Sequence, residues 1–240
     1  MRWHTGPNKV FGIRGNLHFL YGRGLALCGA MAHLEPRMKR MLALQVALDR
    51  AGFSPGQIDA QVSINTERAL RAFQHAHGLH VTGELDRKTV RTLGQPFVHS
   101  VRTYQITSRD VEAALDWMSM ADMLAERFHT SPALLRYINS EARFQDGETL
   151  LVPNVESAAA IPAETPVVVT VAERAHMLSV QDESGEVIFH APLSSAADED
   201  GYAAEPTCLP RVSVGGIRLT SWDAMRLACL MNGTAKVVMR

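Results

Sequence analysis

The chain has 240 residues, a formal net charge of -1 and a sequence pI near 6.8. The balance of 24 basic and 25 acidic residues gives no basic footprint for nucleic acid, so we expect no nucleic-acid partner. No apolar run approaches the ~20 residues that a membrane-spanning helix needs, so we expect no membrane span. The three cysteines, Cys28, Cys208 and Cys229, form no CxxC pair of the kind used by zinc or dithiol redox sites.

Residues 1–35 form an N-terminal extension that has some features of a secretion signal. Basic residues precede a partly apolar stretch over residues 17–32, which ends in the small-x-small pattern Ala30-Met31-Ala32. Arg23 interrupts the apolar stretch, so the signal is weak, and an extended or wrongly assigned start is the alternative. A working signal would place the protein in the periplasm or in the cell envelope.

Residues 36–94 are predicted to form three short helices. The helix starts are marked by proline in a first turn or by N-cap residues: Pro36, then Ser63 or Asn65, then Asp86. The helix ends are marked by glycines suited to the left-handed position: Gly52, Gly78 and Gly94. Leu85, just before the third helix, is expected to pack on Val90 as a hydrophobic staple. Three helices with one shared apolar face make a small bundle.

Residues 95–103 are predicted to form a linker, and residues 104–155 a second unit. The expected order is strand, helix, helix, strand. A strand at 104–107 precedes a helix whose apolar face carries Met120, Leu124 and Phe128. Ser131 and Pro132 mark the start of the next helix, and Pro153 ends a strand at 149–152.

Residues 166–240 are predicted to form a β-rich third unit after a proline-bearing linker. Strands are expected at 167–171, 177–180 and 187–189, with a turn at 183–186 before the third. Cys229 is expected on the apolar face of a short helix. The fold class that follows from all three units is α+β.

The first unit resembles a peptidoglycan-binding domain of the three-helix type. The resemblance rests on residues 44–53 together with Ile58-Asp59, Ala72-Phe73-Gln74, Gly78-Leu79 and Val81-Thr82-Gly83. It implies cell-wall peptidoglycan as the partner. Ala60 stands where the family usually has glycine, and if that turn needs a positive φ, alanine costs about 1 kcal/mol there.

Candidate ligand-binding residues in this unit are three charged side chains, Asp59, Arg68 and Arg71. They could contact acidic or amide groups of wall peptides, and the alternative is that they are ordinary solvated charges. His75, His77 and His80 are close in sequence, but His75 and His77 lie about 200° apart on a helix and His80 follows the Gly78 stop. We therefore predict no metal site and no cofactor.

The second unit resembles a lysin-motif domain. The residues that carry this resemblance are Leu134-Leu135, Asn139, Gly147-Glu148, Leu150 and Val152-Pro153-Asn154. Asn139 is added to the candidate peptidoglycan-binding residues on this ground. The family's opening Gly-Asp-Thr turn is absent, and Ser108-Arg109-Asp110 stands in its place.

The order of the three units resembles the layout of bacterial L,D-transpeptidases, in which a cysteine of a His-Gly-Cys motif attacks the wall peptide. That motif is absent here, so no catalytic residue is assigned. The resemblance fades after about residue 198, which indicates a truncated domain with uncovered strand edges and local disorder beyond that point. The predicted function is non-catalytic binding to peptidoglycan. The alternative is an L,D-transpeptidase that acts in peptidoglycan cross-linking with Cys208 or Cys229 as its nucleophile.

Overall fold

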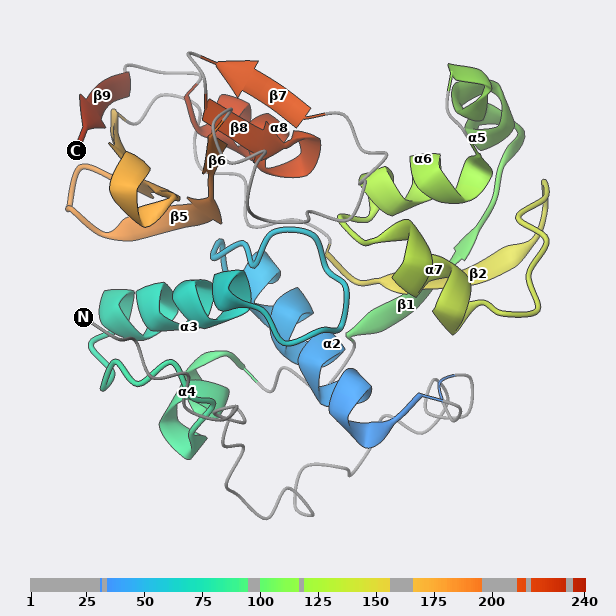
Figure 1. The fold of residues 1–240 in the computed structure, drawn as a ribbon, viewed down its shortest axis with the longest axis horizontal. Helices are drawn as coiled ribbons and strands as arrows, with labels where there is room; N and C mark the ends of the chain where they lie inside the picture. The colour runs from blue at the N-terminus through green and yellow to red at the C-terminus, as the bar shows by residue number, and fades with distance from the viewer. Residues whose placement is uncertain are drawn as a thin grey trace, which may run out of the picture.

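The computed structural model describes residues 31, 34–94, 100–116, 119–155, 166–195, 211–214, 217–231 and 235–240. Most of the predicted N-terminal extension, much of both predicted linkers, and Cys28 and Cys208 lie outside these residues. Helices occupy the N-terminal part and mixed sheets the C-terminal part, so the fold is α+β (Figure 1). No helix in the described ranges combines the length and the apolar character that crossing a bilayer requires.

The helical group comprises α2 (Pro36–Arg50), α3 (Ile64–Ala76) and α4 (Arg87–Thr92), as the sequence predicts. The hydroxyl of Ser63 accepts from the backbone N–H of Thr66, and the carboxylate of Asp86 accepts from that of Thr89. The glycines predicted to end the helices all have positive φ: Gly52, Gly78 and Gly94. Leu85 lies with Val90 in the core of this group, as expected for a hydrophobic staple.

The central group is framed by β1 (Val101–Gln105) and β2 (Thr149–Pro153), which pair in antiparallel register. Between them lie the two predicted helices, α6 (Met120–Arg127) and α7 (Pro132–Ile138). An additional helix, α5 (Ser108–Ala113), continues into the 3-10 turn η2 (Ala114–Asp116), where no helix was predicted. Strand β1 also begins inside the segment that was predicted as a linker.

The extra helix begins with a capping box. The carboxylate of Asp110 is buried and accepts hydrogen bonds from the backbone N–H of Thr107 at 2.8 Å and from its hydroxyl at 2.7 Å. The hydroxyl of Tyr104 also donates to Asp110, at 2.6 Å, and the guanidinium of Arg127 pairs with it. These bonds fix the first turn of α5 and attach it to β1 and to the end of α6.

The C-terminal group contains a four-stranded sheet in the order β5-β4-β3-β9. The strands β3 (Val167–Ala172), β4 (Met177–Gln181) and β5 (Val187–Pro192) form an antiparallel meander close to the predicted one. β9 (Ala235–Met239) adds to β3 in parallel. A three-stranded sheet joins β6 (Ser194–Ser195), β8 (Ile217–Thr220) and β7 (Arg211–Val214).

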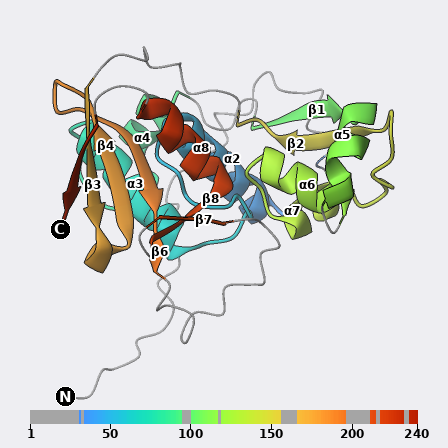
Figure 2. The same ribbon diagram turned by 90° about the horizontal axis from the view of Figure 1, so that it is seen from above.

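The helix α8 (Ser221–Leu230) lies against the four-stranded sheet (Figure 2). Its residues Ala224, Leu227 and Leu230 pack on the cluster that contains the buried valines of β3. In the described part of the chain, the apolar face of this sheet is therefore covered, while β5 and β9 are still its edge strands. α8 covers the apolar face of the sheet, and β9 extends its edge.

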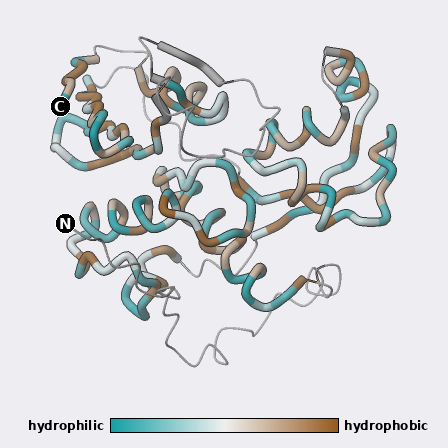
Figure 3. Tube along the Cα trace, viewed as in Figure 1, coloured by the Kyte–Doolittle hydropathy of each residue, from teal (hydrophilic) through white to brown (hydrophobic). Residues whose placement is uncertain are grey.

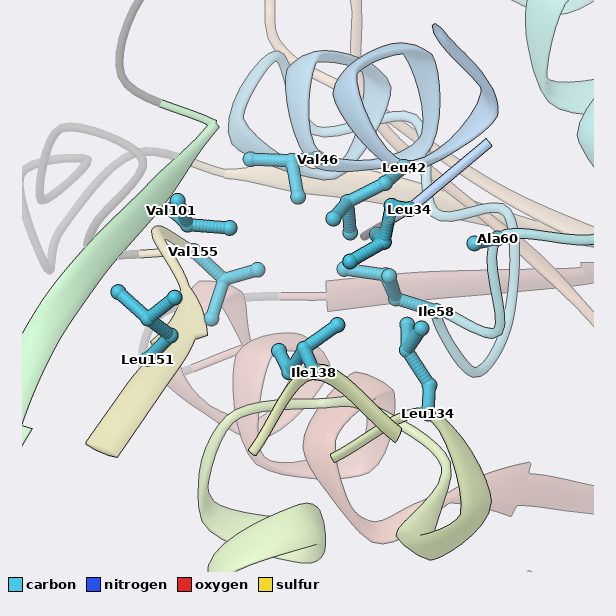
Figure 4. Packing of buried hydrophobic residues seen from close by; sticks show 10 residues of the cluster. All are labelled: Leu34, Leu42, Val46, Ile58, Ala60, Val101, Leu134, Ile138, Leu151 and Val155. Carbon is cyan, nitrogen blue, oxygen red and sulfur yellow. The ribbon is translucent and has the colours of Figure 1, made fainter. Parts of the chain in front are cut away.

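The helical and central groups share one apolar core (Figure 4). Its residues come from α2, the adjoining loops, α7 and the β1–β2 pair: Leu34, Leu42, Val46, Ile58, Ala60, Val101, Leu134, Ile138, Leu151 and Val155. Backbone bonds add to the apolar contact. The N–H of Ile58 donates to the carbonyl of His129 at 2.9 Å, and the N–H of Ser131 donates to the carbonyl of Ile58 at 2.8 Å. The two groups are therefore packed directly against each other.

The helical group also contacts the C-terminal sheet at the outer edge of β5. The N–H of Ser54 donates to the carbonyl of His190 at 2.7 Å, and the N–H of His190 donates to the carbonyl of Gly52 at 2.8 Å. The segment after α2 thus runs along β5 as a short parallel bridge and covers part of its edge.

Candidate functional site

Two loops of the helical group are fixed by two buried glutamines, one on α2 and one on α3. The first, Gln45, is 1% exposed. Its carbonyl Oε1 accepts from the backbone N–H of Ala60 at 2.8 Å and from that of Asp59 at 3.2 Å. Its Nε2 donates to the carboxylate of Asp59 at 2.8 Å and to the hydroxyl of Thr66 at 3.3 Å. One side chain therefore fixes the loop between α2 and α3.

Gln74 does the same for the loop between α3 and α4. It is fully buried, and its Oε1 accepts from the backbone N–H of Thr82 at 2.9 Å and of Gly83 at 2.8 Å. Its Nε2 donates to the carbonyl of Glu84 at 2.9 Å and to the hydroxyl of Thr89 at 3.2 Å. Because a buried amide must find partners for its donors and acceptor, each glutamine specifies one loop conformation.

The outer surface of α3 lies beside the second of these loops. Ile64, Arg68, Arg71 and His75 recur at helical spacing on the side of α3 that faces away from the core. Arg71 donates to the carboxylate of Glu67 at 2.9 Å, and this ion pair lies over Gly83. A β-carbon built on Gly83 would be 2.8 Å from Nε of Arg71, so glycine allows the loop to approach the helix.

Residues 37–93 match the family model described as a putative peptidoglycan binding domain. The match covers all three helices of the helical group and both of the glutamine-fixed loops. It spans less than a third of the chain. No curated protein matches the chain. We call residues 37–93 the peptidoglycan-binding segment below, while the lysin-motif and L,D-transpeptidase resemblances stay predictions.

Three of the four predicted ligand-binding residues belong to the peptidoglycan-binding segment. Arg68 and Arg71 share the outer face of α3, as described above. Asp59 is half-buried, and its carboxylate also accepts from the backbone N–H of Gln61 at 2.8 Å. Asp59 thus shapes the loop that precedes α3.

Asn139 lies in the central group, at the C-terminal end of α7. Its Nδ2 donates to the carbonyls of Leu135 at 2.9 Å and Leu151 at 2.8 Å, and its Oδ1 accepts from the N–H of Leu151 at 2.7 Å. Both amide protons are used in joining α7 to β2. The structure therefore gives Asn139 an internal role, and its contact with a wall ligand stays a prediction.

Ala60 adopts a φ of +59°, so the turn does require the left-handed conformation. Its β-carbon is buried in the core shared with the central group. The strain that alanine brings to this turn, about 1 kcal/mol, is thus partly offset by apolar contact.

One side of the peptidoglycan-binding segment is covered by the C-terminal sheet. The ring of Phe53 packs edge-on against Phe73 at 5.4 Å between centroids, and the imidazole of His190 on β5 stacks on Phe53 at 6.3 Å. Burial lowers the pKa of His190 to about 4, so this imidazole is neutral at pH 7. The covered side excludes a ligand, whereas the described residues leave the outer face of α3 exposed.

Among the cysteines, Cys229 is described and Cys208 is not. The structure places Cys229 on α8, as predicted, but its side chain is exposed and does not lie on the apolar face. The apolar face of α8 is formed by neighbouring residues that pack on the sheet. Within the described ranges, no group of three or more histidine, cysteine, aspartate or glutamate side chains is arranged to hold a metal ion.

Proposed function

We propose that this protein binds bacterial cell-wall peptidoglycan through the outer face of α3 and the loop that packs on it. The observation that carries the proposal is the family match over residues 37–93, which coincides with a complete three-helix bundle. Within the described residues, neither the central group nor the C-terminal sheet covers this face. Its largely hydrophilic character is visible along α3 in Figure 3.

The chemistry of this face suits a wall polymer. Arg68 and Arg71 offer guanidinium groups, which recognise the carboxylates of stem peptides through paired hydrogen bonds. Val62, Ile64 and Val81 are exposed apolar side chains of the same segment, 38%, 44% and 40% accessible, and can contact sugar faces and alanine methyl groups. Asp59 supports the loop before α3 and can accept from an amide of the ligand.

A sedimentation assay with purified sacculi tests this function. We expect the full chain to appear in the pellet, and a variant that carries both Arg68→Ala and Arg71→Ala to be retained less. The matched control is Arg174→Ala, because Arg174 is an exposed arginine in the C-terminal group. Full-chain protein that stays in the supernatant at low and at high salt would contradict the proposal.

We also propose that the chain acts in the cell envelope without catalysis, as a relative of L,D-transpeptidases that lacks their nucleophile. The absence of a His-Gly-Cys motif from the sequence supports this proposal. Incubation with a carbapenem, followed by mass spectrometry of the intact protein, tests it. An acyl adduct on Cys208 or Cys229 would favour the transpeptidase alternative.

A further inference from the structure

Four charged side chains from distant parts of the chain meet in the interior where the three groups join. Asp49 lies on α2, His129 follows α6, and Asp223 and Arg226 lie on α8. Asp49 and Asp223 are 0% exposed and His129 is 2% exposed. Because buried charges are costly unless they are paired, the cluster depends on the charges of all its members.

His129 lies between the two carboxylates. Its Nδ1 is 3.3 Å from Oδ2 of Asp49, and its Nε2 is 3.8 Å from Oδ2 of Asp223. The imidazole also stacks on the indole of Trp222 from α8, with ring centroids 5.5 Å apart and planes inclined by 16°. His129 has a φ of +49°, a conformation that residues other than glycine rarely adopt. Its ring is thus fixed between elements of all three groups.

The two carboxylates of the cluster differ in their other hydrogen-bond partners. Asp49 accepts from the guanidinium of Arg226 at 2.7 Å and from the indole N–H of Trp222 at 3.3 Å. Oδ2 of Asp223 accepts from the hydroxyls of Ser54 at 3.0 Å and Thr220 at 2.8 Å. Oδ1 of Asp223 is buried without a hydrogen-bond partner in the described part of the chain. Asp49 is therefore paired with the guanidinium of Arg226, whereas Asp223 is paired with the imidazole of His129.

We propose that His129 is a proton-controlled clamp, which holds the peptidoglycan-binding segment on the other two groups when protonated and releases it as the pH rises. With the imidazolium present, two cations face two carboxylates. Loss of the proton leaves Asp49, Asp223 and Arg226 with one uncompensated buried negative charge. Glu126 on α6 is a further titratable group that interacts with His129, and it adds negative potential when it is ionised.

The sign of the pH dependence follows from the environment of the histidine. Burial lowers the pKa of His129, but the charges of Asp223 and Asp49 outweigh burial and raise that pKa above its ordinary 6.5. Burial raises the pKa of Asp223, so the two groups titrate as one cluster that binds a proton. The docked state holds this proton above pH 6.5 and the separated state does not. The ratio of docked to separated molecules should therefore fall by up to about tenfold per pH unit until the clamp is deprotonated.

Histidine side-chain NMR on the unmodified full chain measures the clamp directly. We expect the His129 imidazole to titrate with a pKa above 6.5, and its resonance to be missing from His129→Gln. Amide hydrogen exchange gives the structural readout, because the N–H groups of Ser54, Ile58 and His190 bond across the two boundaries of the peptidoglycan-binding segment. Their protection, corrected for intrinsic exchange, should fall over the same pH range. A His129 pKa at or below 6.5 would overturn the proposal.

Two variants separate a proton switch from a purely structural contact. Asp223→Asn keeps a hydrogen-bonding side chain but removes one negative charge, so the pKa of His129 should move downward. His129→Gln should remove the loss of amide protection above pH 6.5. His75→Gln is the control, since His75 is an exposed histidine on α3 and its loss should leave the profile unchanged. An unshifted His129 pKa in Asp223→Asn, or an unchanged profile in His129→Gln, would exclude the clamp.

Discussion

Replacing Gly52 with alanine should weaken the contact between the peptidoglycan-binding segment and the C-terminal sheet. Gly52 ends α2 with a φ of +86°, and its carbonyl accepts from the N–H of His190 at 2.8 Å. A β-carbon at this position would be 2.6 Å from the carbonyl oxygen of Ile188. The carbonyl oxygen is part of the backbone and the β-carbon is bonded to it, so a side-chain rotation cannot relieve the overlap.

Two effects lower the free energy of unfolding of Gly52→Ala. Placing alanine in the left-handed region costs about 1–2 kcal/mol, and crowding a packed boundary costs roughly another 1–3 kcal/mol. Gly78 provides a matched control, because it ends α3 with a φ of +62° and a β-carbon there would meet nothing within 4 Å. Gly78→Ala should therefore show the backbone cost alone. We expect Gly52→Ala to lower the free energy of unfolding by about 2 kcal/mol more than the control does.

Urea denaturation of the full-length variants measures this difference, and hydrogen exchange locates it. In Gly52→Ala the amides of Ser54 and His190 should lose protection, while the amides within α2 and α3 keep theirs. Equal destabilisation by Gly52→Ala and Gly78→Ala would refute the reasoning, because the close approach to β5 would then contribute nothing.

Three further changes test other parts of the structure. Ala60→Gly should relieve the left-handed strain but lose a buried methyl group, so its unfolding free energy in urea should change by less than about 1 kcal/mol in either direction. Gln74→Leu leaves the backbone N–H groups of Thr82 and Gly83 unsatisfied and should destabilise the chain by about 3 kcal/mol in the same assay. Because the pKa of His190 is lowered to about 4, the folded state should lose stability as pH falls from 6.5 toward 4, by up to about 3 kcal/mol. In urea titrations at several pH values, His190→Leu should remove that part of the loss, and an unchanged pH dependence would show that His190 does not cause it.

The elements that the sequence predicts best are those whose signals are local. The N-caps at Ser63, Asp86 and Ser131 all accept a hydrogen bond from a backbone N–H three residues later. Such a bond depends on a few adjacent residues and needs no knowledge of the tertiary structure. The strands of the β3–β4–β5 meander are likewise neighbours in the chain, and their alternation or β-branched composition indicates them directly.

Helix α5 had a local signal that the sequence interpretation did not use. Thr107 and Asp110 are spaced as in a capping box, which indicates a helix start at this point. The pairing of β9 with β3 had no such signal, because Val167 and Ala235 are far apart in sequence. Non-local pairings of this kind follow from how the chain packs as a whole and cannot be deduced from local propensity.

The two buried glutamines illustrate the same limit within the candidate site. Gln45 and Gln74 each follow an apolar residue, Leu44 and Phe73, in the family-like motif. The sequence shows a polar residue near the apolar face of each helix, but it does not indicate the hydrogen-bond partners of that residue. The structure shows that each amide holds the backbone of a loop. A polar residue at a core position of a helix is the signal that would have indicated this role.

Gly52 and Asp49 have roles that the three-helix group alone does not explain. Within the helical group, Gly52 is a C-terminal glycine and Asp49 is one residue of α2. In the whole chain, Gly52 lets the backbone reach β5, and Asp49 is the fully buried partner of His129 and Arg226. The side-chain partners of this carboxylate, His129, Trp222 and Arg226, all lie outside the α2–α4 bundle. The charge on Asp49 is therefore explained by docking with the other two groups, and its burial is a property of the assembled chain.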